Sequence, residues 1–415
     1  MDNSLRKETF YLYLIQVANF IIPLAAFPYL THTLGVQGFG KLGFAQTVYF
    51  LCVFFIDFGF NLSGAKMVGK YRNSQIRLNY IYSNIQVVRF LIYIFLLVII
   101  LPLLFSGWLE EIDATLILIA LISAAGAVLT PNYIFNGLSS NSVLALISIF
   151  IKSIFLVPIF FFVKDVNDLT LAAFLQMISG VVIGVAAQYY LFKRQLVKFS
   201  PTKINKKVIR RESKKSSDLF IASFFTLGFT YLTPILIKFT LGDFAVGLYS
   251  VVDRLITAMR QLYQPITQAF FSKVCVAYAE KEFITYNLLL RKIFFMFSVI
   301  GGVGLVGNIL VGDTVLPLVF GKNYDVQGFL SIAILTQIIV SYASIVVNFM
   351  IIPKGNAIVL KWIYLLTMII YFPLLWVLMF KYQLLGVFSS ILIVEIFVLL
   401  LLICYVLNTN LRKPL

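Results

Sequence analysis

The basic stretch at residues 193–215, KRQLVKFSPTKINKKVIRRESKK, decides how the chain is organised. Its 23 residues hold ten Lys or Arg and one acid, and it lies near the midpoint of the 415 residues. Long apolar segments lie on both sides of it. Because Lys and Arg concentrate in the cytoplasmic loops of membrane proteins, the stretch predicts a cytoplasmic linker loop between an N-terminal half, 1–192, and a C-terminal half, 216–415.

The composition indicates a membrane protein. Hydrophobic residues make up 61% of the chain, charged residues 12%, and the mean hydropathy is +0.97, which is far more apolar than a soluble domain. In a soluble protein, the net charge of +16 would indicate a nucleic-acid partner. Here the cations fall between apolar segments, so they indicate orientation and contact with anionic lipids, and we predict no nucleic-acid partner. Three scattered cysteines predict neither a disulfide framework nor a metal site, and no cofactor is expected.

Apolar runs of about 20 residues are long enough to cross a bilayer. Six precede the basic linker, at 10–30, 42–62, 81–105, 114–135, 143–163 and 169–192, and six follow it, at 219–241, 245–271, 293–311, 329–352, 362–380 and 384–407. The predicted fold class is an all-α polytopic membrane protein with twelve transmembrane helices in two six-helix bundles.

The distribution of cations predicts the orientation. With both termini inside, the inner segments hold 24 Lys or Arg and the outer segments hold five, while eight acids also lie outside. This asymmetry favours the N-in/C-in topology.

A weak internal repeat supports two equivalent halves. Leu34, Gly35 and Gly40 recur as Leu241, Gly242 and Gly247, at a common offset of 207 residues, after the first span of each half. Six spans per half bring both halves into the membrane from the same side, as in transporters built from parallel repeats.

Charged residues inside the spans are the candidate functional residues, because they are costly there and usually face a bundle interior or a watery cavity. The cations are Arg89, Lys152, Arg254 and Arg260. They predict an anionic ligand, with pyrophosphate fitting well. The alternative is that their long stems carry the charge to the interface.

Three carboxylates inside the spans are candidates for ion coupling: Asp57, Asp253 and Glu395. Asp57 or Glu395 could bind a proton or a cation and couple its gradient to transport. The alternative is that they pair with the buried cations, and Asp253 directly precedes Arg254. Asp253 and Arg260 are seven residues apart and share one helical face.

The chain resembles the Wzx-type O-antigen flippases over its whole length. The matching residues are Phe27-Pro28-Tyr29-Leu30, Leu34-Gly35, Phe39-Gly40, Phe44, Gln46, Phe58-Gly59-Phe60-Asn61, Pro265-Ile266-Thr267-Gln268-Ala269, and Gly321 with Tyr324-Asp325. The resemblance implies the multidrug/oligosaccharidyl-lipid/polysaccharide exporter fold, with two bundles around a cavity that opens alternately to either side.

The resemblance also implies a substrate, an undecaprenyl-pyrophosphate-linked oligosaccharide repeat unit, and its transport from the cytoplasmic to the periplasmic leaflet. The O-antigen polymerase and the chain-length regulator are the further partners to consider. Two alternatives remain. One is an antiporter or exporter of the same fold for a drug or another lipid-linked precursor, although a pump for cationic drugs should have more acid than base in its cavity. The other is a polytopic glycosyltransferase or polymerase, which the short outer loops disfavour.

Overall fold

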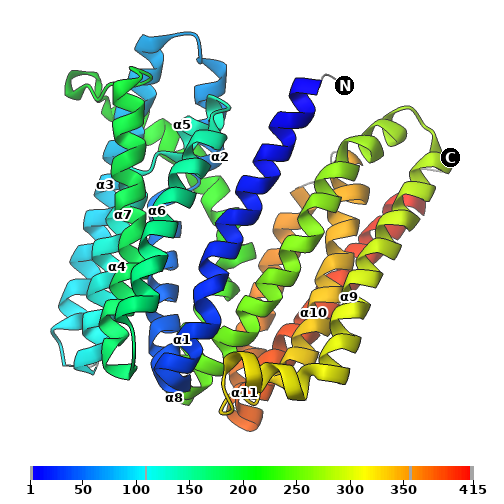
Figure 1. The fold of residues 1–415 in the computed structure, drawn as a ribbon. Helices are drawn as coiled ribbons and strands as arrows, with labels where there is room; N and C mark the ends of the chain where they lie inside the picture. The colour runs from blue at the N-terminus through cyan, green and yellow to red at the C-terminus, as the bar shows by residue number, and fades with distance from the viewer. Residues whose placement is uncertain (1–2, 108–109, 355–357, 412–415) are drawn as a thin grey trace. The chain divides into compact units, whose positions relative to one another are not determined.

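The computed structural model describes residues 3–107, 110–354 and 358–411, and in this part of the chain all regular structure is helical (Figure 1). The chain forms two compact units, Met1–Leu236 and Ile237–Leu415. The division lies inside a helix rather than in the basic linker. The six-helix division predicted from the sequence therefore stays a prediction.

The N-terminal unit contains seven helices and the start of an eighth. They are α1 (Asn3–Asp57), α2 (Phe60–Lys70), α3 (Gln75–Leu104), α4 (Glu111–Leu129), α5 (Asn132–Gly137), α6 (Asn141–Phe162), α7 (Leu169–Lys193) and the first part of α8 (Lys206–Ala279), with short 3-10 turns at Val166–Asp168 and Pro201–Lys203. Helix α4 packs most extensively on α7 and α1.

The C-terminal unit is built from the rest of α8 and three long helices. These are α9 (Phe283–Phe320), α10 (Gln327–Ile345), which continues into a π-helical turn at Val346–Ile351 and a 3-10 turn at Ile352–Lys354, and α11 (Ile358–Leu411). Helix α10 packs against both α9 and α11.

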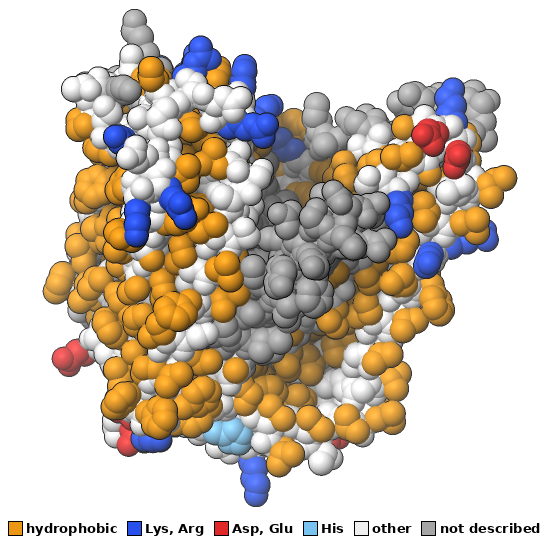
Figure 2. Space-filling view, turned by 45° about the horizontal axis from the view of Figure 1, so that its top comes forward, with side chains coloured by type: hydrophobic (Ala, Val, Ile, Leu, Met, Phe, Trp, Pro, Cys, Tyr) orange, Lys and Arg blue, Asp and Glu red, His pale blue; other side chains and the backbone are white. Residues whose placement is uncertain are grey.

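Nine helical segments in the described residues are long and apolar enough to cross a membrane. Three of them are far longer than one crossing requires, at 46, 50 and 50 residues. The helices α1, α8 and α11 in these segments each contain one residue with a non-helical backbone, Gly35, Gly242 or Gln383. Hydrophobic side chains dominate the visible surface (Figure 2), as expected for helices that face lipid.

The two kinks at glycine have the same backbone conformation. Gly35 has φ 65° and ψ 179°, and Gly242 has φ 80° and ψ −177°, a region that only glycine enters readily. These are the glycines that recur at the offset of 207 residues. The helix otherwise runs through residues 31–41, which the sequence predicted as a loop, because no other residue there breaks it.

Two further breaks follow from local sequence. Phe58 and Gly59 both have positive φ and separate α1 from α2. Thr130 is extended because Pro131 follows it, so the predicted span 114–135 is divided into α4 and α5. The second half of the expected linker loop is helical, since α8 begins at Lys206 and no Gly or Pro follows it for several turns.

We expect Gly35→Ala and Gly242→Ala to destabilise the protein by about 1–3 kcal/mol each. A Cβ at either position meets nothing within 4 Å, so the cost is backbone strain alone. The thermal midpoint of the detergent-purified protein measures it. Gly307→Ala is the control, because this helical glycine also has open space around it. Equal midpoints for all three variants would contradict the role assigned to the kinks.

Candidate functional site

The largest group of charged residues from the sequence prediction lies in the C-terminal unit on α8, after the kink at Gly242. Asp253 and Arg254 are half-buried, whereas Arg260 is exposed. Asp253 interacts electrostatically with both Arg260 and Arg254. The carboxylate therefore lies near both guanidinium groups of the same helix, and Asp253 and Arg260 are the pair that the seven-residue spacing placed on one face.

Two other helices contribute to this group. On α10, the buried Gln337 accepts a hydrogen bond from Arg260 Nε at 3.3 Å. On α11, the half-buried Glu395 interacts electrostatically with Arg260. The structure thus brings Asp253, Arg254, Arg260 and Glu395 together, and we call these four residues with Gln337 the α8 cluster.

The formal charges in the α8 cluster balance, with two guanidinium groups and two carboxylates. The sequence predicted an excess of cations over acids, and the excess is absent from this cluster. An anionic ligand must therefore compete with Asp253 and Glu395 for the guanidinium groups. Arg260 is the more accessible of the two.

Tyr249 and Tyr324 interact electrostatically with members of the cluster, and Tyr371 interacts with Tyr249. Tyr249 and Tyr371 are buried, and Tyr249 interacts electrostatically with Asp253 and Arg260. Tyr324, in the segment between α9 and α10, interacts with Arg254, and burial raises the pKa of its phenol, which keeps it a neutral hydrogen-bonding group. Tyr324 is among the residues that carry the family resemblance. The sequence analysis did not identify the other two tyrosines or Gln337. A polar residue at 337, inside an apolar helix, was the available signal.

Arg89 lies in the N-terminal unit and is 1% exposed. Its terminal nitrogens donate to the carbonyl of Thr130 at 3.1 Å, to the carbonyl of Ala127 and to Gln86 Oε1 at 3.2 Å. In a continuing helix the carbonyl of Ala127 would accept from residue 131, and Pro131 has no N–H to donate. The carbonyl of Thr130 also accepts from the backbone N–H of Asn132 at 3.0 Å. Arg89 therefore replaces one missing backbone donor and places a cation where the helix dipole favours one.

The two other predicted residues of this unit differ in their surroundings. Asp57, the last residue of α1, interacts electrostatically with Arg89, as the pairing alternative anticipated. Lys152 in α6 is half-buried and has no hydrogen bond or ion pair with any residue that the structure describes. Of the two predicted cations of this unit, Arg89 and Lys152, it is Lys152 that remains available to a ligand.

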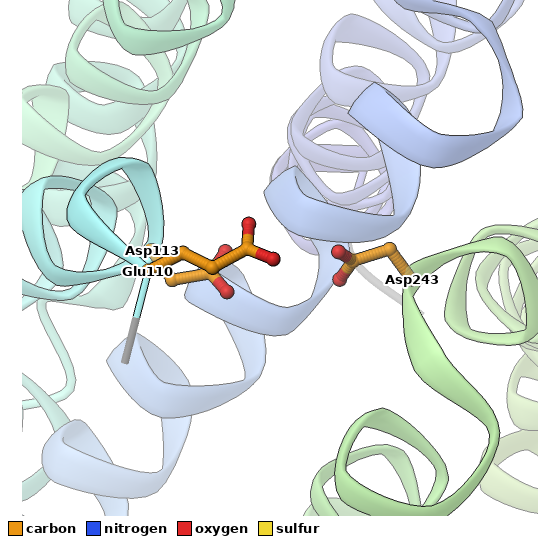
Figure 3. A group of neighbouring side chains, drawn as sticks. All are labelled: Glu110, Asp113 and Asp243. Carbon is orange, nitrogen blue, oxygen red and sulfur yellow. The ribbon is translucent and has the colours of Figure 1, made fainter. Parts of the chain in front are cut away.

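Two more carboxylates lie together at the first turn of α4, Glu110 and Asp113 (Figure 3). Glu110 accepts a hydrogen bond from Lys41 Nζ at 2.6 Å, and Asp113 is buried. The start of a helix stabilises negative charge, so the pair is explained by its helix and by the contact with α1. The third carboxylate in Figure 3, Asp243, belongs to the C-terminal unit, where Lys238 binds it.

Residues 5–271, more than half of the chain, match the family model described as polysaccharide biosynthesis protein. The chain belongs to this family. A predicted O-antigen transporter of Shigella dysenteriae is 25% identical over 398 residues, which cover 95% of this chain and 98% of the relative. A protein with the same description in Escherichia coli strain K12 is 24% identical over 322 residues, covering 78% and 77%.

Solved structures agree on the fold of the family. An inward-facing multidrug resistance MATE family transporter of the MOP superfamily matches with a TM-score of 0.70 at 14% identity, over 96% of this chain and 99% of that one. A MOP superfamily transporter from Pyrococcus furiosus matches with a TM-score of 0.57 at 16% identity, over 98% and 94%. The resemblance drawn from the sequence is confirmed, and the chain is a multi-pass protein of the bacterial inner membrane with a transporter fold.

We expect Arg89→Met to lower the free energy of unfolding by about 3 kcal/mol or more, because it leaves the carbonyl of Ala127 without a donor and Asp57 without its cation. The thermal midpoint of the purified protein measures the effect. Arg89→Lys keeps the charge without the forked geometry and should fall between wild type and Arg89→Met.

Arg72→Met, which removes an exposed cation just outside α2, serves as the control for the Arg89 variants. A midpoint for Arg89→Met equal to that of Arg72→Met would show that Arg89 does not stabilise the end of α4.

Proposed function

We propose that the protein is a flippase that transfers undecaprenyl-pyrophosphate-linked O-antigen oligosaccharide repeat units from the cytoplasmic to the periplasmic leaflet. The observation that carries the proposal is the exposed Arg260 on a membrane-crossing helix, held by a hydrogen bond and by carboxylates from its surroundings. The relatives of matching length are described as O-antigen transporters, and guanidinium groups bind phosphate oxygens strongly.

The proposed topology has twelve transmembrane helices, with both termini in the cytoplasm. Counting each of the three bent segments among the nine as two crossings gives twelve. The excess of Lys and Arg in the predicted inner segments supports the orientation. In this scheme the halves 1–192 and 216–415 each form a six-helix bundle, and the two bundles open alternately to either side.

The α8 cluster suggests how binding and release alternate. Without substrate, Asp253 and Glu395 neutralise the two guanidinium groups, so no uncompensated charge remains inside the membrane. The pyrophosphate displaces a carboxylate from Arg260, and the displaced Glu395 takes up a proton. Release of the substrate on the other side restores the attraction between Glu395 and Arg260 and returns the proton to water there. In this scheme the proton moves outward together with the substrate.

The residues of the N-terminal unit have two different roles in this proposal. Lys152 is a second contact for the anionic head or for acidic sugars, since it has no partner in the described residues. Arg89 and Asp57 preserve the junction of α4 and α5 and act on substrate only by positioning that junction. The O-antigen polymerase and the chain-length regulator remain proposed partners downstream of the transfer.

Complementation tests the function. We expect the wild-type gene, expressed with its cognate sugar genes in a strain that lacks its own O-antigen flippase, to restore polymerised surface polysaccharide. Arg260→Gln should reduce the polymer about tenfold or more at equal membrane abundance, because it removes charge-assisted hydrogen bonds to phosphate. Immunoblots of surface polysaccharide and of the tagged protein give both quantities.

Arg291→Gln is the matched control, because Arg291 is an exposed cation on α9 outside the α8 cluster. It should complement like wild type. Full polymer with Arg260→Gln would reject the proposed substrate site while leaving the transporter. Absence of polymer with the wild-type gene, its sugar genes being present, would reject the function.

A further inference from the structure

A pocket of about 230 Å³ lies at the linker end of the N-terminal unit, between α2, α3 and the first turns of α8. The α8 cluster contributes none of its lining residues. They are Phe60, Met67, Tyr71, Arg77, Tyr80, Ile81, Asn84, Ile85, Val88, Ile209, Arg211, Glu212 and Ser213. The pocket thus combines apolar side chains with charged and polar ones.

The linker is fixed in place next to this pocket by side chains of α3. Gln75 Nε2 donates to the carbonyls of Gln195 and Leu196, both at 2.9 Å. The backbone N–H of Lys198 donates to Asn79 Oδ1 at 2.7 Å, and that of Ser200 to Ser83 Oγ at 2.9 Å.

The same series of contacts reaches the start of α8. The backbone N–H of Asn205 donates to Asn84 Oδ1 at 2.9 Å, and Ser216 Oγ lies 2.6 Å from Ser63 Oγ on α2. Positions 75, 79 and 83 follow the four-residue spacing of one helix face. This face orders the linker and thereby holds Arg211 and Ser213 at the pocket.

Two arginines provide the cationic side of the pocket. Arg77 lies with its guanidinium 4.5 Å from the centre of the Tyr71 ring and is exposed. Arg211 is 67% exposed at its side chain and donates from Nε to Glu212 at 2.8 Å. A guanidinium has five N–H donors, so the terminal nitrogens of Arg211 can bind further oxygens while Nε stays with Glu212.

The apolar side of the pocket lies along α3. Ile81 and Ile85 are buried, and Val88 is half-buried. From Arg77 to Val88 the helix rises roughly 16 Å. The lining therefore passes from exposed cations to side chains that belong at the depth of lipid tails. Phosphate at one end and hydrocarbon at the other would match both parts.

We propose that this pocket binds the phosphate of a lipid headgroup, with Arg77 and Arg211 contacting phosphate oxygens and the α3 side chains contacting the first part of the apolar tail. This chemistry is shared by bilayer phospholipids and by polyprenyl phosphates. The proposal stands on the pocket alone and does not require the transport activity proposed above.

Native mass spectrometry of the full-length protein, released from detergent, measures the binding. Phosphatidic acid and uncharged diacylglycerol of the same chain length are added in equal amounts. We expect wild type to retain phosphatidic acid, and Arg77→Gln/Arg211→Gln to retain about tenfold less. Ser213→Phe, which fills the pocket without changing charge, should show a similar loss.

Arg72→Gln/Arg210→Gln is the matched control, because it removes two exposed cations next to those tested that do not line the pocket. It should retain phosphatidic acid like wild type. Equal losses in both double variants would show that phosphate lipids bind the basic surface in general, and no loss in either would exclude the pocket; both results overturn the proposal.

Undecaprenyl phosphate, added in competition with phosphatidic acid, identifies the source of the phosphate. Loss of most of the bound phosphatidic acid from wild type at less than an equimolar amount of undecaprenyl phosphate would make the pocket a loading point for a polyprenyl carrier. Retention of phosphatidic acid at an equimolar amount would make it a site for bilayer phospholipid. Complementation is scored separately, so a wild-type protein that complements but retains no more phosphatidic acid than diacylglycerol would overturn this proposal alone.

Discussion

The pairing of polar groups inside the membrane is the constraint on which the structure depends. A carbonyl or a guanidinium that cannot reach water must find a partner within the protein. Arg89 shows the consequence most clearly, because Pro131 follows the end of α4 and leaves the carbonyl of Ala127 without its helical donor, which Arg89 replaces. The same constraint places carboxylates beside Arg254 and Arg260 in the C-terminal unit.

Much of the helical architecture could be predicted from the sequence, because lipid forces long apolar runs to be helices. The recurrence of the glycines at 35 and 242 was visible in the sequence, which placed both in loops after a first span, but their shared kinked backbone conformation is known only from the structure. The sequence could not show that the helices continue on both sides of these kinks. An apolar run ends where polar residues begin, and this says nothing of whether the helix itself ends there. The division of 114–135 at Pro131 was similarly hidden by its apolar neighbours.

The charged residues of the candidate site could be predicted from the sequence, but the equal number of cations and carboxylates in the α8 cluster could not. Asp253 and Arg260 could be placed together because both lie on one helix, where spacing determines the face. The approach of Glu395 and Gln337 to Arg260 depends on the packing of α10 and α11, which one sequence does not contain. For the same reason Arg89 looked like a ligand contact in the sequence. Its partners in the structure are the carbonyls of Ala127 and Thr130 and the side chain of Gln86. No residue pattern indicates a contact with a backbone carbonyl.

The ordered linker changes what the basic stretch can do. A free polybasic loop would contact anionic lipid only through diffuse attraction, which salt weakens. Side chains at 75, 79, 83 and 84 instead fix the first part of the linker along α3. Arg211 and Ser213, in its helical second part, are thereby held next to apolar side chains of α3. Ordering a cation in advance reduces the entropy lost on binding. Because Arg211 is held in a fixed position at the pocket, it can distinguish one lipid headgroup from another, which net charge alone cannot do.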